Sequence, residues 1–111
     1  MAAQENKPSV LTPISLCDLV DYQQGSVVSN TLVKKEKGTV TMFAFDEGEG
    51  LSEHTAPFDA LVQIVDGEAD VSVGDATHRV GPGEVLLLPA DIPHSVQARA
   101  QFKMLLTMIR A

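Results

Sequence analysis

The chain has 111 residues, which is enough for one domain with a single core and too few for two. Its formal net charge of −7, from 15 acidic and 8 basic residues, argues against nucleic acid or an anionic membrane as a partner. Cys17 is the only cysteine and the N-terminus lacks the apolar stretch of a signal peptide, so we expect no internal disulfide and a cytoplasmic location.

Residues 1–25 are predicted to form a polar tail and one short helix. Thr12 supplies a capping residue, and Pro13 after it suits the first helical turn. The apolar side chains available to this helix are Ile14, Leu16, Leu19 and Val20. We expect the helix to be either a lid or an element that packs against the domain that follows.

Residues 26–111 change to short strands and are predicted to form the single domain. Segments 26–34 and 39–45 are rich in β-branched or aromatic residues and flank a short turn, which is typical of a hairpin. The segment 46–52 is expected to be a turn leading to His54. Further strands are predicted at 58–65, 69–73, 77–80, 85–88, 94–98 and 102–109, separated by turns rich in glycine, proline and aspartate.

This pattern of many short antiparallel strands with almost no helix predicts an all-β sandwich or a closed jelly-roll barrel. No apolar run approaches the roughly 20 residues needed to cross a bilayer. In the last predicted strand, Lys103 and Thr107 alternate with apolar residues, so one side of this strand is expected to be buried. The apolar residues of this strand are Phe102, Met104, Leu106 and Met108.

Two stretches of the chain each join a glycine turn to an apolar strand and carry one histidine. The landmarks are Gly48, His54 and Gly67 in the first stretch and Gly83, Pro89 and His94 in the second. Their spacings resemble the two motifs of the cupins, small jelly-roll barrels also described as double-stranded β-helices. The resemblance covers roughly residues 38–109. It implies that the two motifs meet at the barrel mouth, where cupins hold a metal.

Four positions depart from the cupin pattern. Of the four ligands that the resemblance implies, only His54 and His94 are present. Ala56 stands where the motif has its second histidine, and Ala60 where it has a glutamate. In the second motif, Ala98 replaces the final asparagine and Asp91 replaces the inner glycine. Because a transition metal usually needs three or more protein donors, we expect a site for Fe, Mn, Ni or Zn that is weak or absent.

Other side chains could complete the site only from the correct face of their strand. Glu53 and Asp59 adjoin the motif positions, so on an extended strand they point to the opposite face. Gln63 is a third candidate ligand, since a buried amide needs partners. Strict alternation turns Gln63 away from Ala60, whereas a β-bulge, common in cupins after the glutamate position, would turn it into the pocket.

Structural roles remain as alternatives for both histidines. His54 could close a loop by hydrogen bonding, and His94 could anchor the turn that precedes it. His78 is expected at the surface of a hairpin. Cys17 lacks the basic neighbour that marks a nucleophile, and no G-x-S-x-G motif indicates a hydrolase.

The favoured hypothesis is a small cupin that binds a small organic molecule with one polar or anionic end. Its pocket would be floored by Ala56 and Ala60 and edged by His54, Gln63 and His94. The alternative is a metal-dependent enzyme of the dioxygenase or isomerase type, with the two histidines and Gln63 as ligands.

A homodimer is also expected from the segment 26–34. This predicted edge strand carries apolar side chains on both faces, more than an edge exposed to water should carry. The residues concerned are Val27, Val28, Leu32 and Val33.

Overall fold

The computed structural model describes residues 10–110, which form one short 3-10 helix and nine strands. The helix, η1, spans Leu16–Leu19. The strands are β1 (Val27–Lys35), β2 (Gly38–Phe45), β3 (Gly50–His54), β4 (Asp59–Asp66), β5 (Ala69–Val73), β6 (Ala76–Val80), β7 (Val85–Leu88), β8 (His94–Gln97) and β9 (Phe102–Ile109). The all-β fold predicted from the sequence is confirmed. Among residues 10–110, no helix has the length and apolar character of a membrane span.

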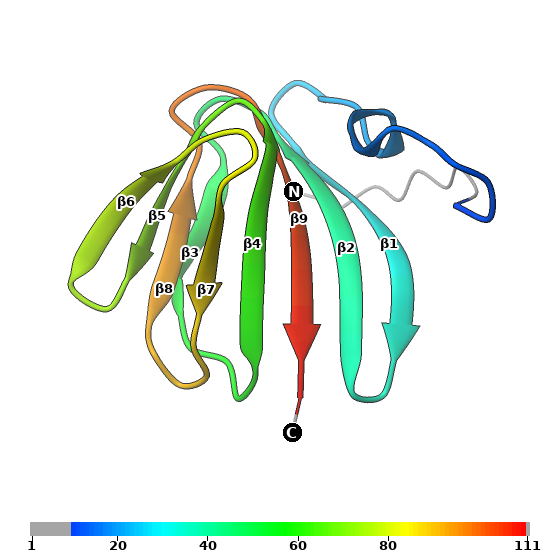
Figure 1. The fold of residues 1–111 in the computed structure, drawn as a ribbon. Coiled ribbons are helices and arrows are strands. Elements are labelled where there is room, and N and C mark those ends of the chain that lie inside the picture. The colour runs from blue at the N-terminus through cyan, green and yellow to red at the C-terminus, as the bar shows by residue number, and fades with distance from the viewer. Residues whose placement is uncertain (1–9, 111) are drawn as a thin grey trace.

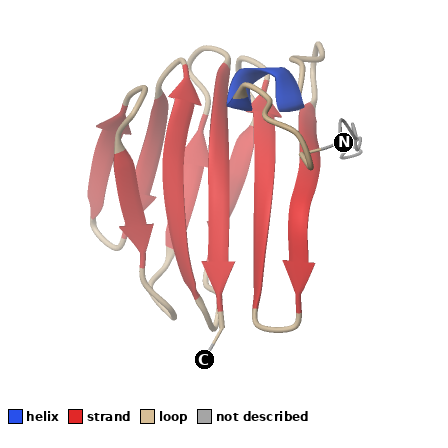
Figure 2. Cartoon of the chain, turned by 45° about the vertical axis from the view of Figure 1, so that its right-hand side comes forward, coloured by secondary structure: helices blue, strands red, loops and turns tan. Residues whose placement is uncertain are grey.

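The strands form two antiparallel sheets that curve around a common core (Figure 1). Sheet A has the order β1-β2-β9-β4-β7, and sheet B has the order β3-β8-β5-β6. Strands from distant parts of the chain are neighbours, as in the pairing of β2 with β9. Seen from the side, strands dominate the molecule and the single helical turn lies outside them (Figure 2). This is the arrangement of a jelly roll.

The main core lies between the two sheets, and alternation along β4 shows how a strand contributes to it. On β4, Ala60, Val62 and Ile64 are buried, while the residues between them are more exposed. Near one end of the barrel, Phe45 and Phe102 stack with ring centroids 4.6 Å apart and an angle of 9° between the rings. Large side chains therefore fill that end of the barrel.

A second apolar cluster lies under η1, on the outer face of sheet A. It contains Leu19, Val20, Val28, Met42 and Ala44. These contacts explain why the N-terminal segment folds onto the barrel rather than away from it, because they bury an apolar face that sheet A would otherwise present to water.

Two buried polar side chains of sheet A hold the carbonyl groups of η1. Asn30 Nδ2 donates to the Leu19 carbonyl at 3.0 Å, and Lys103 Nζ donates to the Cys17 carbonyl at 2.7 Å. Lys103 is only 8% exposed. Its face of β9 is therefore covered as well, so the expectation of a single buried side is wrong at this end of the strand, because η1 lies over it.

Two further details differ from the sequence prediction. The segment 46–52 is not all turn, because β3 begins at Gly50. A Cβ at Gly50 would lie 2.3 Å from the Val96 carbonyl oxygen, so glycine allows β3 to approach β8 closely. The helix begins at Leu16 with Ser15 as N-cap, so Thr12 and Pro13 do not start it.

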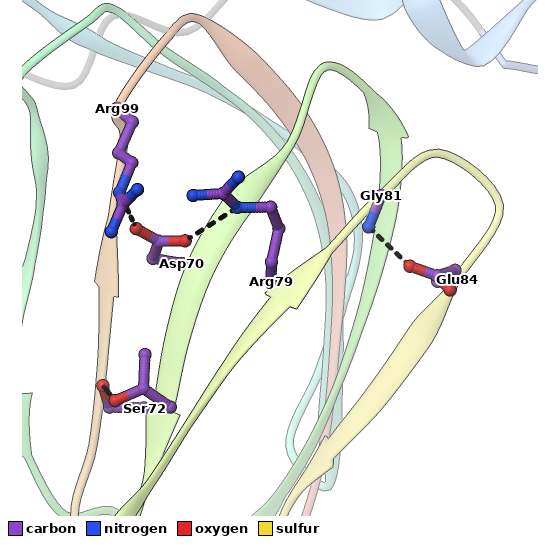
Figure 3. A network of polar contacts seen from close by, with 7 residues as sticks. Asp70, Ser72, Arg79, Gly81, Glu84 and Arg99 are labelled. Carbon is purple, nitrogen blue, oxygen red and sulfur yellow. Dashed lines mark hydrogen bonds and ion pairs between the residues drawn. The ribbon is translucent and has the colours of Figure 1, made fainter.

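The outer faces of the two sheets differ in chemistry. On sheet B, Asp70 lies between Arg79 and Arg99 and forms an ion pair with each (Figure 3). His78 is exposed on the same hairpin, as predicted. The uncovered part of sheet A instead exposes Leu61, Val85, Leu87 and Ile109.

Most of the apolar residues of β1 from which a dimer was expected are already covered within the chain itself. Val27 and Val28 are buried within the chain itself, at 7% and 5% exposure. Val27 belongs to the main core and Val28 to the cluster under η1. Of the apolar residues that motivated the dimer, Val33 is the one that remains exposed.

Candidate functional site

A cavity of about 340 Å³ opens between the sheets at one end of the barrel. At this end, the lower one in Figure 1, lie the turns that join β1 to β2, β3 to β4 and β7 to β8, together with the end of β9. The polar side chains lining the cavity are His54, Thr55 and His94. The rest of the wall is apolar and includes Val62, Leu88, Val96, Met104, Leu106 and Met108.

The pairing of β3 with β8 brings His54 and His94 together at the cavity. The two residues are Cα partners across the strands. Their Nε2 atoms are 3.1 Å apart, and the rings meet edge to face at an angle of 73°. The two motifs thus deliver both histidines to one place, as their spacings predict.

Each histidine also contacts a backbone carbonyl through its other ring nitrogen. His54 Nδ1 lies 2.7 Å from the Ser52 oxygen, and His94 Nδ1 lies 3.2 Å from the Ile92 oxygen. The pair therefore makes three contacts between potential acceptor atoms, and each contact needs a hydrogen atom or a cation between the two atoms. Two neutral imidazoles carry only two N–H groups, so the neutral pair is one hydrogen short. A metal ion bound by both Nε2 atoms would satisfy all three contacts.

The Nε2 separation fits two neighbouring ligands of one metal ion. Two nitrogens at about 2.05 Å from an ion and 3.1 Å from each other subtend an angle of about 100°. Within residues 10–110, however, no group of three or more His, Cys, Asp or Glu side chains could hold a metal. The donor set fits half of a tetrahedral site, and water or a ligand would have to supply the rest.

Ala56 and Ala60 both line the cavity, where the motif resemblance would have placed a histidine and a glutamate. Ala60 is 4% exposed and pairs with Leu88 of β7. The methyl groups leave open, apolar space beside the histidines. This side of the cavity offers no further donor to a metal.

Gln63 does not reach the cavity. Its strand pairs regularly with β7 from Ala60 to Gln63 and with β9 from Asp59 to Ile64, and the first irregularity in the pairing with β9 comes after Ile64. The bulge that would have turned Gln63 inward is not formed, so alternation places its side chain on the outer face of sheet A. Gln63 therefore cannot join His54 and His94 in one site.

The loops at the mouth are tied to each other through the backbone. Asp91 N donates to the Ala56 carbonyl at 2.8 Å, and Ala90 N donates to Asp59 Oδ1 at 2.9 Å. Asp91 has a φ of 66°, a left-handed conformation that aspartate tolerates. The same conformation explains why the cupin motif has a glycine at this position. The rim that carries both histidines is fixed by these bonds.

Burial changes the acid–base behaviour of His94. The side chain is 7% exposed, whereas His54 is exposed. Desolvation lowers the pKa of His94, the hydrogen bond to Ile92 opposes this, and the neighbouring His54 lowers the pKa further. A low pKa favours the neutral ring, which is the form that accepts a metal or a hydrogen-bond donor.

Phe58, Met104 and Met108 line the cavity, and Met104 is at the same time a buried member of the main core. A sequence signal was available for Met108, because it holds the last inward position of β9 and this strand ends at the mouth of the cavity. No sequence signal distinguished Phe58, because the residue lies in the β3–β4 loop just before β4 begins.

Comparison with known proteins gives one family match and many structural matches. Residues 38–109 match the model of the AraC-like ligand binding domain. A conserved protein of unknown function from Streptococcus pyogenes is 32% identical over 100% of this chain and 96% of its own, with a TM-score of 0.89. No curated protein matches the chain at a significant level.

Two further solved structures carry the cupin name. A cupin superfamily protein from Desulfitobacterium hafniense is 29% identical, covering 99% of this chain and 100% of its own, with a TM-score of 0.88. A cupin 2 conserved barrel domain protein from Leptotrichia buccalis is 42% identical over 84% of this chain and 45% of its own, with a TM-score of 0.80.

The low pKa of His94 predicts how stability depends on pH. Because the folded pKa lies below the unfolded value of about 6.5, the contribution of the neutral ring is complete above that value and is lost as pH falls through the folded pKa. In urea unfolding with chelator, wild type should lose more stability between pH 7 and pH 5 than His94→Asn. His78→Asn, on the exposed hairpin, controls for removal of a histidine. Parallel profiles for wild type and His94→Asn would contradict the argument.

Proposed function

The chain belongs to the AraC-like ligand binding domain family and is a small cupin, and on this premise we propose that it binds a small organic molecule in the cavity. The observation that carries the proposal is an apolar cavity whose rim presents two paired imidazoles. Natural small-molecule sites combine a mostly apolar wall with a few placed polar groups, and about 300 Å³ is the lower end of their volume range. The ligand is therefore small.

The apolar wall supplies affinity and the histidine pair supplies orientation. Burial of apolar surface contributes about 25 cal/mol per Å² removed from water, so a ligand that contacts Val62, Leu88 and Leu106 gains most of its binding energy there. The Nε2 atoms of His54 and His94 face each other at the rim. They would contact a polar group of the ligand through a shared metal ion.

We propose that any Fe, Mn, Ni or Zn ion at the pair is weakly held. Two imidazoles occupy two coordination positions, and Gln63, the expected third ligand, lies on the other face of β4. A bound ion would supply Lewis-acid coordination of a ligand atom. The alternative function, a metal-dependent enzyme of the dioxygenase or isomerase type, needs a firmly held ion, so the donor set favours a binding module.

We also propose that the protein is a homodimer, formed through the uncovered outer face of sheet A. Leu61, Val85 and Leu87 are 41%, 57% and 52% exposed on adjacent strands β4 and β7. Contact between two such faces would cover these apolar side chains. The cytoplasmic location remains a prediction from the sequence alone.

The dimer predicts a particle of two chains in light scattering at micromolar concentration. Leu61→Lys with Leu87→Lys should shift it to one chain, because a charge at each face would lose hydration on association. Arg79→Lys, on the outer face of sheet B, provides a control. A wild-type particle of one chain would overturn the dimer.

Filling the cavity should weaken ligand binding. With 1-octanol as a neutral apolar probe, Ala60→Phe should reduce affinity at least about tenfold in titration calorimetry, because the ring occupies the space that the probe needs. Ala76→Phe makes the same change at an exposed position of β6 and should leave affinity unchanged. Equal affinity in a folded Ala60→Phe protein would place the probe elsewhere.

Restoring the two missing donors should create a strong metal site. Ala56→His with Ala60→Glu adds two side chains to the cavity that His54 and His94 already line, so Zn²⁺ or Ni²⁺ affinity should rise by two or more orders of magnitude. Adding His54→Ala to the double variant should remove most of the gain. A folded double variant that binds no better than wild type would show that these positions do not converge on the histidines.

A further inference from the structure

A second, smaller cavity adjoins the first one at the same end of the barrel. Its volume is about 170 Å³, and its wall includes Phe58 and Met108, which also line the main cavity. The remaining lining comes from the β1–β2 hairpin and from Arg110, just after β9. A molecule in the main cavity that extends past Phe58 and Met108 would reach this side cavity.

Basic side chains lie together at the side cavity, although the chain as a whole is acidic. Lys34, Lys35 and Arg110 line it, with Glu36 as the one acidic residue of the lining. These three belong to a total of only 8 basic residues, against 15 acidic ones. Neither Lys34 nor Lys35 forms an ion pair with any residue that the structure describes. Their charges are available to an anion.

A hydroxyl group in the side cavity also lacks a partner. Thr39 Oγ1 is buried and makes no hydrogen bond, and it is the one buried side-chain nitrogen or oxygen within residues 10–110 of which this is true. Leaving such a group without a hydrogen-bond partner destabilises the folded protein. Thr39 lines the side cavity together with the lysines. Rotation of the Thr39 side chain toward the cavity would let this hydroxyl donate to an acceptor atom bound there.

The histidine side of the main cavity is less suited to an acid group. All four ring nitrogens of His54 and His94 already contact the Ser52 carbonyl, the Ile92 carbonyl or each other. Without a metal ion, no N–H of the pair points at a ligand. Cationic side chains and a free hydroxyl are present on the other side of Phe58 instead.

We propose that the ligand is an amphipathic organic acid, whose apolar body fills the main cavity and whose acid group is held by Lys34, Lys35 and the hydroxyl of Thr39. Phe58 marks the boundary between the two parts. Its ring is held in place by the Arg110 guanidinium, 5.5 Å from the ring centroid. This inference rests on the proposed function and adds the ligand's chemical class to it.

The test compares octanoate with 1-octanol, which share an apolar chain and differ in charge, by titration calorimetry with chelator present. Octanoate should bind wild type more tightly than 1-octanol does. Lys34→Gln with Lys35→Gln should weaken octanoate about three- to tenfold, since an exposed ion pair contributes modestly, and should leave 1-octanol unchanged. Arg79→Gln with Arg99→Gln changes the net charge equally on the outer face of sheet B (Figure 3) and should have no effect on either probe.

Thr39→Val tests the hydroxyl separately. It should weaken octanoate about two- to fivefold and leave the stability of the ligand-free protein unchanged or higher, because the hydroxyl it removes has no partner. If both probes bind but the lysine variant behaves like its arginine control, the side cavity does not hold the acid group and the proposed function stands. If neither probe binds wild type, the proposed function fails, and the inference fails with it.

Discussion

The uninterrupted pairing of β4 with its two neighbours decides what the cavity contains. From Asp59 to Ile64 the strand keeps one register with β9, and from Ala60 to Gln63 with β7. Every second side chain therefore points inward, so Ala60 and Val62 face the cavity and Gln63 faces out. A single bulge would have exchanged the two sets. This register makes the cavity apolar, leaves it with two histidines as its main polar groups, and places an uncovered apolar surface on the outside of sheet A.

Electrostatics divides the mouth of the barrel into two different parts. On one side, two imidazoles contact each other and two carbonyls, and burial lowers the pKa of His94 so that its ring favours the neutral form. On the other side, the β1–β2 hairpin and the residue after β9 bring cationic side chains next to an unpartnered hydroxyl. Between them lies an apolar wall. The arrangement matches a molecule with an apolar body and one charged end better than it matches a firmly held metal ion.

The sequence was informative where turns and alternation determine structure. Glycine and proline turns located β5, β7 and β9 correctly, and motif spacing brought His54 and His94 together. It failed where the deciding contact comes from a distant segment. β3 is polar and largely exposed, so no apolar pattern indicates it, and its position depends on the approach of Gly50 to β8. Lys103 is buried only because η1 covers it, and Phe58 lines the cavity only because its loop crosses the mouth.

Methyl chemical shifts would test most directly whether the cavity is the binding site. Along β4 and β7, Val62 and Leu88 point into the cavity and Leu61 and Leu87 point away from it. In a titration of methyl-labelled wild-type protein with octanoate, we predict saturable shifts at Val62, Leu88 and Leu106, with Leu61 and Leu87 unchanged. Shifts confined to the outward-facing methyl groups, or spread equally over both sets, would contradict the account.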